Sequence, residues 1–272
     1  MMEKNPATMR FTILGCGSSP GTPRINGDWG ACDPENPRNR RSRCSLLVER
    51  ITRRGTTTVV IDTSPDFRAQ MLAAKVQHLD GVLDTHPHAD HIHGIDDLRQ
   101  YAIIQHEQIK VHADRPTLDH LQNAFTYCFK AINGAMNPPI CEANEIFPGI
   151  AVRIEGEGGV IDFLPIRQIL GPIHSLAFRI GYFAYSSDVS EIPVESVPHF
   201  EGLDMWVLDA LQYRNHVSHF SLDQALEWID RMKPREALLT HMHIPLDYET
   251  VQGETPPHVQ PAYDGLVLEY EI

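Results

Sequence analysis

Histidine and aspartate side chains that suit a metal ion are concentrated in one short stretch, directly after a predicted strand at residues 79–84. Within six residues the stretch contains His86, His88, Asp90 and His91. Side chains alternate in an extended segment, so His86 and His88 point to the same side, and a tight turn after them can bring Asp90 and His91 to the same point. Imidazole nitrogen and carboxylate oxygen are the ligands expected for zinc, iron or manganese at a hydrolytic site. The alternative is a solvent-facing histidine-rich loop, but the spacing favours a metal centre at the end of a strand.

Strand and helix patterns are mixed along the whole chain of 272 residues. A β-branched run predicts a strand at 57–62 that pairs with one at 45–49, and apolar spacing predicts a helix from Leu222 to Ile229 with a capping box of Ser221 and Gln224. Further strands are predicted at 10–14, 110–113, 151–154, 160–165, 176–180, 182–186, 205–209 and 236–240. This order favours an α/β protein in which helices cover sheets. We expect one domain over residues 10–272, preceded by a flexible lead at 1–9.

Charge limits the partners that such a domain can bind. The formal net charge is −13, which argues against long nucleic-acid partners because these need clustered Lys and Arg. A small phosphate-containing substrate is still compatible, since a bound metal ion can reverse the local field. The basic run at 38–43 lies in a long loop at 15–43, and it is either a solvated loop face or a phosphate-attracting flap in which Arg41 and Arg43 contact substrate.

The five cysteines are scattered and none forms a C-x-x-C pair, which favours a reducing compartment. No signal-peptide core precedes the first strand, and no window approaches 18 apolar residues. We therefore expect a cytoplasmic protein with no membrane partner. The sequence predicts no oligomeric state.

The H-x-H-x-D-H pattern of the histidine stretch resembles the signature of the metallo-β-lactamase superfamily. Gly15, Gly17, Asp62 and Gly94 are also similar to residues of that family, and the resemblance extends over nearly the whole chain. It implies a four-layer αβ/βα sandwich with two divalent metal ions, zinc or manganese, at one edge of the sheets. Within the superfamily the chain is most similar to the branch containing the phosphoribosyl cyclic phosphodiesterase, and ribonuclease Z is a more distant relative.

The resemblance also implies metal ligands from later parts of the chain. Asp188 matches the bridging carboxylate, although an Asp after a strand can also be a helix N-cap. His241 matches the last family histidine, and His243 is a possible substitute two residues on. At Leu170, where similar sequences carry histidine, this chain departs from the pattern. Either His174 completes the first metal site instead, or that site is weakened.

A histidine beside a helix start completes the expected site. The resemblance implies that His219, two residues before the capped helix, protonates the leaving oxygen. A helix start also favours an anion beside it, and an imidazole titrates near neutral pH. His216 is the nearby competitor and a candidate substrate contact, and Asp90 is counted as catalytic as well as metal-binding. Some branch members hold a structural zinc through clustered cysteines in the early loop. This chain has Cys32 there without the other cysteines of that cluster, so no structural zinc is expected.

These residues favour a metal-dependent phosphodiesterase that acts on a small cyclic or nucleotide-like phosphodiester. The two metal ions would lower the pKa of a water molecule shared between them, and Asp62 would orient a ligating imidazole. One alternative is a transfer-RNA 3′-processing endonuclease, which the negative charge disfavours. Another is a non-catalytic nucleotide- or metabolite-binding protein weakened at Leu170. Fold alone does not select among substrates.

Overall fold

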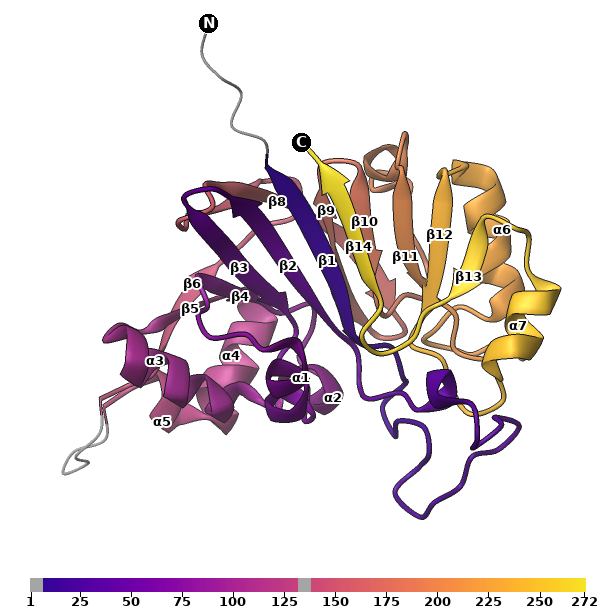
Figure 1. Cartoon of the computed structure of the whole chain (residues 1–272), viewed down its shortest axis with the longest axis horizontal. Coiled ribbons are helices and arrows are strands. Elements are labelled where there is room, and N and C mark those ends of the chain that lie inside the picture. The colour runs from indigo at the N-terminus through magenta and orange to yellow at the C-terminus, as the bar shows by residue number, and fades with distance from the viewer. Residues whose placement is uncertain (1–6, 132–137) are drawn as a thin grey trace, which may run out of the picture.

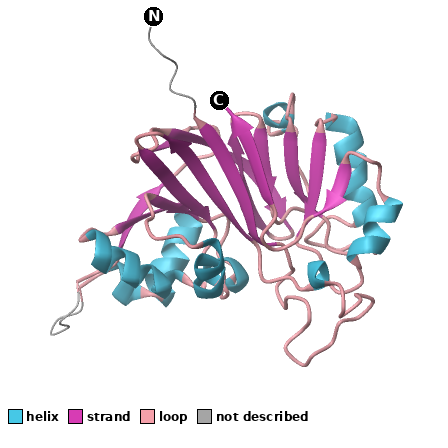
Figure 2. Cartoon of the chain, in the orientation of Figure 1, coloured by secondary structure: helices cyan, strands magenta, loops and turns pink. Residues whose placement is uncertain are grey.

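Two sheets of seven strands face each other, and helices cover their outer sides (Figures 1 and 2). The computed structural model describes residues 7–131 and 138–272. The first sheet has the order β14-β1-β2-β3-β4-β5-β6 and the second β13-β12-β11-β10-β9-β8-β7. The predicted four-layer αβ/βα sandwich is therefore confirmed.

The elements of the first half have the following bounds: β1 (Thr8–Gly15), η1 (Pro37–Asn39), β2 (Ser45–Thr52), β3 (Gly55–Ile61), α1 (Phe67–Ala74), β4 (Gly81–Leu83), α2 (Ala89–Ile92), η2 (Ile95–Leu98), α3 (Arg99–Gln105), β5 (Ile109–Ala113), α4 (Arg115–Ala124), α5 (Thr126–Phe129) and β6 (Cys141–Glu145). Those of the second half are β7 (Val152–Ile154), β8 (Ile161–Leu170), β9 (Ile173–Ile180), β10 (Phe183–Ser186), η3 (Val197–Phe200), β11 (Met205–Asp209), α6 (Leu222–Met232), β12 (Glu236–Thr240), α7 (Tyr248–Glu254), β13 (Val259–Pro261) and β14 (Val267–Glu271).

Alternation along the strands builds two apolar layers. In β2, Leu46 and Val48 belong to the core between the sheets, whereas Leu47 packs in the core under helices α1 to α4. In β3, Val59 faces the inter-sheet core and Val60 faces the helices. Because both faces of these strands are buried, their sequences are continuous apolar runs rather than alternating ones.

Parallel strands in each sheet end at the same edge. Strands β3, β4 and β5 run parallel in the first sheet, and β10, β11, β12 and β13 run parallel in the second. Ligands of open α/β sheets gather at the carboxyl ends of such strands. The histidine stretch follows β4, so the topology brings it to the edge where β10, β11 and β12 also end.

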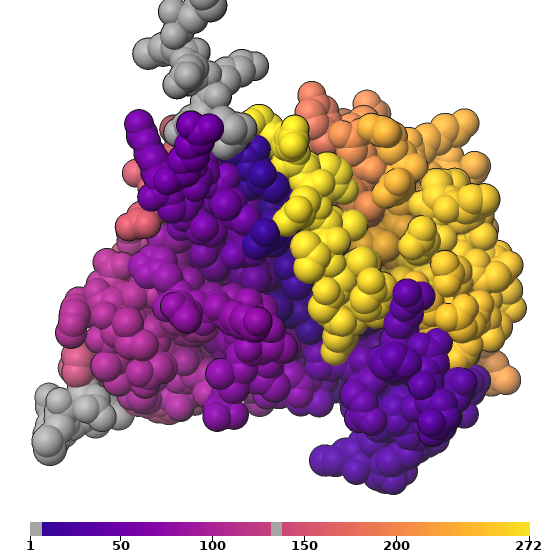
Figure 3. Space-filling model, in the orientation of Figure 1, coloured from indigo at the N-terminus to yellow at the C-terminus, as the bar shows by residue number. Residues whose placement is uncertain are grey.

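The early loop between β1 and β2 has little regular structure, as predicted, but it is well anchored. Thr22 and Arg41 exchange backbone hydrogen bonds, each 2.9 Å long, and the Ala31 N–H donates to the Ile244 carbonyl at 3.0 Å. In Figures 1 and 3 this indigo-to-purple loop projects beside the yellow segment that contains α7.

The structure changes some predicted boundaries. β1 begins at Thr8, so Thr8 and Met9 belong to the sheet and not to a flexible lead, while residues 1–6 lie outside the described part. β14 was not predicted. It lies near the other end of the chain from β1 and pairs antiparallel with it, and its residues are exposed or partly exposed. The capping box of Ser221 and Gln224 is present at the start of α6. None of the helices within 7–131 and 138–272 is long and apolar enough to cross a membrane.

Candidate metal centre

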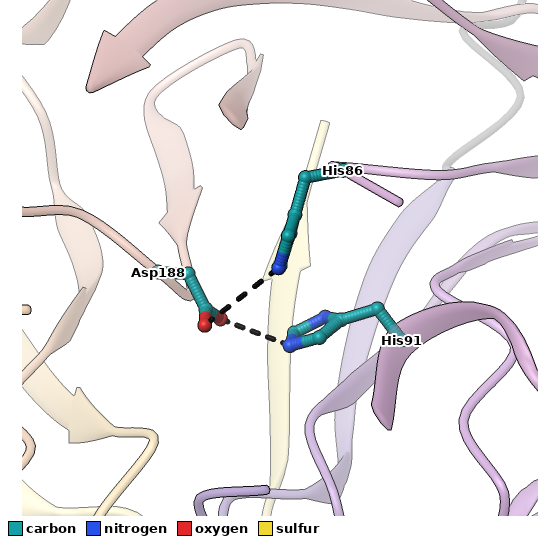
Figure 4. Close-up of side chains that lie close together, drawn as sticks. All are labelled: His86, His91 and Asp188. Atoms are coloured by element: carbon teal, nitrogen blue, oxygen red, sulfur yellow. Dashed lines mark ion pairs between the residues drawn. The ribbon is translucent and has the colours of Figure 1, made fainter. Parts of the chain in front are cut away.

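Three side chains from the two sheets converge at the shared edge (Figure 4). His86 and His91 follow β4, and Asp188 follows β10. His91 Nε2 lies 3.1 Å from Asp188 Oδ1, and His86 Nε2 lies 3.9 Å from Asp188 Oδ2. All three residues are buried. The predicted partnership between the histidine stretch and the later aspartate therefore exists in space.

Two further predicted residues complete the cluster. His241 follows β12, and its Nε2 lies 3.3 Å from Asp188 Oδ2 and 3.8 Å from Asp90 Oδ2. Asp90 Oδ2 is also 3.5 Å from His91 Nε2. Asp188 thus lies between the histidines of the two sheets, where a bridging carboxylate is expected.

The donor atoms of this cluster have the properties of a cation site. Among the described residues, His86 Nε2, His91 Nε2, His241 Nε2 and Asp188 Oδ1 are buried and have no hydrogen-bond partner. Unpaired buried polar atoms are costly and rare in native proteins, and here several point to one place. Imidazole nitrogens and carboxylate oxygens suit zinc or manganese, so the residues present fit divalent metal ions.

Charge in the cluster also favours a cation. Burial alone would raise the pKa of Asp188, but the imidazoles of His241, His91 and His86 hold it well below its usual range. Burial would likewise raise the pKa of Asp90, which the neighbouring His91 and His241 lower. Burial lowers the pKa of His86 well below its ordinary value. The carboxylates are therefore ionised and His86 is a neutral donor. Burial would lower the pKa of His91 and of His241, but the Asp188 carboxylate raises both well above their ordinary value, so a bound cation would replace the protons on these two rings.

Asp62 contacts His91 at the ring nitrogen that faces away from Asp188. Its Oδ2 lies 2.7 Å from His91 Nδ1, and its carboxylate accepts the Thr85 N–H at 2.8 Å. A bond at Nδ1 fixes the ring tautomer and directs Nε2 toward the cluster. This is the orienting role predicted for Asp62.

Two residues of the site, Asp62 and His241, have an unusual backbone conformation. Asp62 has φ of 68° and His241 has φ of 56°. Residues with a Cβ rarely adopt the left-handed region, and such strain costs roughly 1–3 kcal/mol and concentrates at functional sites. Both residues are buried at the strand ends, so the surrounding structure maintains a conformation that orients their side chains.

A histidine–aspartate pair adjoins the cluster. His219, just before α6, places its Nδ1 2.9 Å from Asp209 Oδ2, and its ring stacks on that of His241 with centroids 4.5 Å apart. One donor atom each from His219, Asp188 and His241 lies within 4.8 Å of the others. Asp209 was not predicted as a site residue, although it ends the predicted strand 205–209. His216 is exposed, with its ring centroid 5.3 Å from that of His219.

His88 occupies the rim of the cluster. Its ring centroid is 4.6 Å from that of His86, but the side chain faces solvent and is absent from the three donor groups found among the described residues. It remains a predicted ligand whose ring adjoins the site.

The structure corrects the prediction that His174 is a ligand. In β9, Ser175 points toward the site and its Oγ donates to the Asp188 carbonyl at 2.7 Å. His174 is the preceding residue and therefore lies on the opposite face of the strand, where it is exposed and contacts Arg167. Leu170 is completely buried and has no donor atom in its side chain.

The prediction that His243 could replace His241 as a ligand is also wrong. Its Nδ1 lies 2.8 Å from Ser18 Oγ, and its Nε2 accepts from Arg24 Nη2 at 2.6 Å. Both ring nitrogens are thus used away from the cluster, and His241 is the histidine that reaches it.

Of the two predicted substrate-binding arginines, Arg41 is a structural residue. It is 1% exposed, and its Nη2 donates to Asn39 Oδ1 at 3.0 Å and to the Leu246 carbonyl at 2.6 Å. Its burial excludes a direct substrate contact. Arg43 is partly exposed and lines a cavity together with Asp90.

Comparisons with known proteins agree with this geometry. A family model described as the β-lactamase superfamily domain matches residues 57–242. An octanoyltransferase from Porphyromonas gingivalis (strain ATCC BAA-308 / W83) is 33% identical over 261 residues, which are 95% of this chain and 51% of the relative. The chain therefore spans about half the length of that relative.

Solved structures show the same architecture. The crystal structure of a new diphosphatase from the PhnP family has a TM-score of 0.87 and 32% identity, over 98% of this chain and 99% of the other. Zn(2+)-bound PqqB from Methylobacterium extorquens has a TM-score of 0.69 and 15% identity, over 95% and 99% of the two chains. The second similarity shows the fold alone.

Proposed function

Since the chain belongs to the metallo-β-lactamase superfamily, we propose that it is a metal-dependent hydrolase that cleaves a small substrate with a phosphodiester or diphosphate linkage. The observation that carries this proposal is the convergence of unpartnered nitrogen and oxygen atoms at Asp188, beside the separate pair of His219 and Asp209. The similarity to a diphosphatase over nearly the full length of both chains supports the same bond type.

In this proposal the cluster residues bind the metal ions, and the neighbouring His219 transfers a proton. When bound, divalent metal ions, zinc or manganese, would act as Lewis acids on the phosphoryl group and lower the pKa of a water molecule. His86, His91, Asp90, Asp188 and His241 would hold them, with His88 at the rim. Asp188 contributes to both halves of the cluster, because its two oxygens face histidines of different sheets.

His219 is placed to move a proton. The Asp209 carboxylate fixes the orientation of its ring through Nδ1, which leaves Nε2 available to a substrate oxygen. An imidazole held in this way can deliver a proton to the departing oxygen. We assign His219 as the general acid and Asp209 as its positioning residue.

We further propose that the substrate is small and not a long nucleic acid. The net charge of −13 opposes the extended phosphate contacts that RNA binding needs. A cytoplasmic location is part of this proposal, because the substrates considered are phosphorylated metabolites.

The octanoyltransferase relative favours a second candidate, hydrolysis of an acyl ester or thioester. That relative is about twice as long as this chain, so its name refers to a protein of which about half is not matched by this chain. An octanoyl thioester therefore belongs in the substrate panel.

The proposal is tested by measuring bound metal by elemental analysis and turnover on a panel. The panel contains bis(p-nitrophenyl) phosphate, thymidine 5′-(p-nitrophenyl) phosphate, a diphosphate diester and an octanoyl thioester, each with zinc or manganese. We expect metal-dependent cleavage of a phosphate substrate and a loss of about 10³-fold in kcat for Asp188→Asn, a magnitude typical of removing one preorganised charge-stabilising group. Asp162→Asn, an exposed carboxylate paired with Arg153, is the matched control. Metal-loaded protein that cleaves only the thioester, or nothing, would contradict the proposal.

A further inference from the structure

A cavity adjoins the candidate metal centre on the side of the early loop. It is lined by Asp90 and, from the loop and its end, by Ser19, Arg24, Asn26 and Arg43. Asp90 also belongs to the donor cluster, so the cavity borders the place where a phosphoryl group would bind. Two arginines in one cavity are notable in a chain with a net charge of −13.

Arg24 is held in a defined position. Its Nη2 donates to His243 Nε2 at 2.6 Å, and its Nη1 donates to Asp28 Oδ2 at 3.1 Å. Asp28 is fixed in turn, because its Oδ1 accepts the Gly30 N–H at 2.9 Å. A guanidinium has five N–H donors, so these two bonds orient the group and leave donors for a ligand. The side chain is 40% exposed, which makes those donors accessible.

Arg43, which also lines the cavity, lies against a carboxylate. Its Nε lies 3.0 Å from Asp66 Oδ2, and the same carboxylate oxygen accepts the Arg43 backbone N–H at 2.9 Å. Among the described residues its terminal nitrogens have no carboxylate partner. Each guanidinium is therefore positioned by a neighbouring carboxylate, and among the described residues its other nitrogens have no carboxylate partner.

We infer that Arg24 and Arg43 form a subsite for a second phosphate of the substrate. The planar fork of arginine matches the oxygens of a phosphate group and binds it through two parallel hydrogen bonds. The inference rests on the proposed function and deepens it. The preferred substrates are small molecules with two phosphate groups, one at the metal cluster and one, not cleaved, in the arginine cavity.

The other role for these contacts is purely structural. The bonds from Arg24 to His243 and Asp28 could serve only to fasten the early loop over α7 and its preceding segment. In that case a second phosphate would add nothing to affinity, and the two roles predict different binding data.

Isothermal titration with product-like ligands separates these roles without requiring turnover. Metal-loaded protein is titrated with thymidine 3′,5′-bisphosphate and with thymidine 5′-monophosphate, which differ only in the second phosphate. We expect the bisphosphate to bind at least about tenfold more tightly, the scale of a charge-assisted bidentate contact. Arg24→Gln and Arg43→Gln should each remove most of that ratio. Arg24→Lys should retain only part of it, because the charge remains and the fork is lost.

Arg38→Gln is the matched control, since Arg38 lies in the same loop but stacks over Tyr248 and Tyr263. Its ratio should equal that of the wild type, and thermal melting of every variant checks that the loop change leaves the protein folded. A wild-type ratio near one, or a ratio unchanged in both glutamine variants, would overturn the subsite. Tight, arginine-dependent bisphosphate binding without any phosphate-ester turnover would instead refute the proposed function and leave the subsite in place.

Discussion

At the scale of single residues, the site depends on carboxylates that orient the histidine rings through hydrogen bonds. Asp62 does not face the cluster but bonds to His91 Nδ1 and thereby determines which ring nitrogen His91 presents. Asp209 does the same for His219. Both carboxylates are completely buried, and each follows or ends a strand, where backbone geometry is well defined.

Replacing Asp62 by Asn should weaken metal binding without removing a ligand. The amide can turn its NH₂ toward His91 Nδ1 and favour the wrong tautomer, so we expect a loss of about 10–100-fold in zinc affinity. Competition with a chromogenic zinc indicator measures this change. Asp162→Asn is again the control, and an unchanged affinity in Asp62→Asn would contradict the orienting role.

At the scale of elements, one carboxylate joins the early loop to α7. Asp247 is the N-cap of α7, and its Oδ1 accepts the Thr250 N–H at 3.0 Å. Its Oδ2 accepts from Asn39 Nδ2 at 2.6 Å and from the Asp33 N–H at 3.1 Å. Burial alone would raise the pKa of Asp247, but the N–H groups of Thr250 and Asp33 lower it to about 2. The loop that supplies Arg24 and Arg43 is therefore fastened to a helix cap.

Asp247→Ala should destabilise the protein through both elements. Loss of a helix N-cap costs about 0.5–2 kcal/mol, and the unpaired donors of Asn39 and Asp33 add to that cost. Urea unfolding measures the free energy, and proteolysis measures exposure of the loop. Gln252→Ala, at an exposed position later in the same helix, should leave both nearly unchanged; equal effects in the two variants would exclude a specific role for the cap.

At the scale of the whole molecule, Asp264 connects the last strand to the base of the early loop. Its Oδ2 accepts from the Ser42 N–H and Oγ at 2.7 Å, and its Oδ1 accepts the Cys16 N–H at 3.1 Å. Burial raises its pKa to about 6 although these bonds lower it. The folded protein therefore holds this proton more tightly than the unfolded chain, in which an aspartate titrates near 3.9.

This raised pKa predicts a pH dependence with a definite sign. The stabilising contribution of the bound proton is fully present below about pH 4 and is lost as pH rises through about 6. We expect the wild type to lose up to about 3 kcal/mol relative to Asp264→Asn between pH 4 and 7. Chemical unfolding of both proteins across this range measures the difference. A difference that stays constant, or one that grows in favour of the wild type as pH rises, would contradict the shift.

Much of the fold and the core of the site followed from local patterns. Strand periodicity, the capping box at Ser221 and the spacing from His86 to His91 depend on backbone geometry within a few residues, which is the same wherever the segment lies. Longer-range features were predicted less well. β14 pairs with β1 from the other end of the chain, and its amphipathic pattern is too short and exposed to mark it.

The sequence by itself thus indicated a strand that ends in a turn rich in potential metal ligands, and its resemblance to a known family implied the sandwich around that turn. Only the tertiary structure decided which distant side chains reach that turn. His241 enters the cluster and His243 does not, His174 lies on the wrong face of β9, and Arg24 rather than Arg41 reaches the cavity beside Asp90. The physical reason is that strand order and loop anchoring bring together residues that are far apart in the sequence, such as Asp90 and His241, and no local period encodes such a distance.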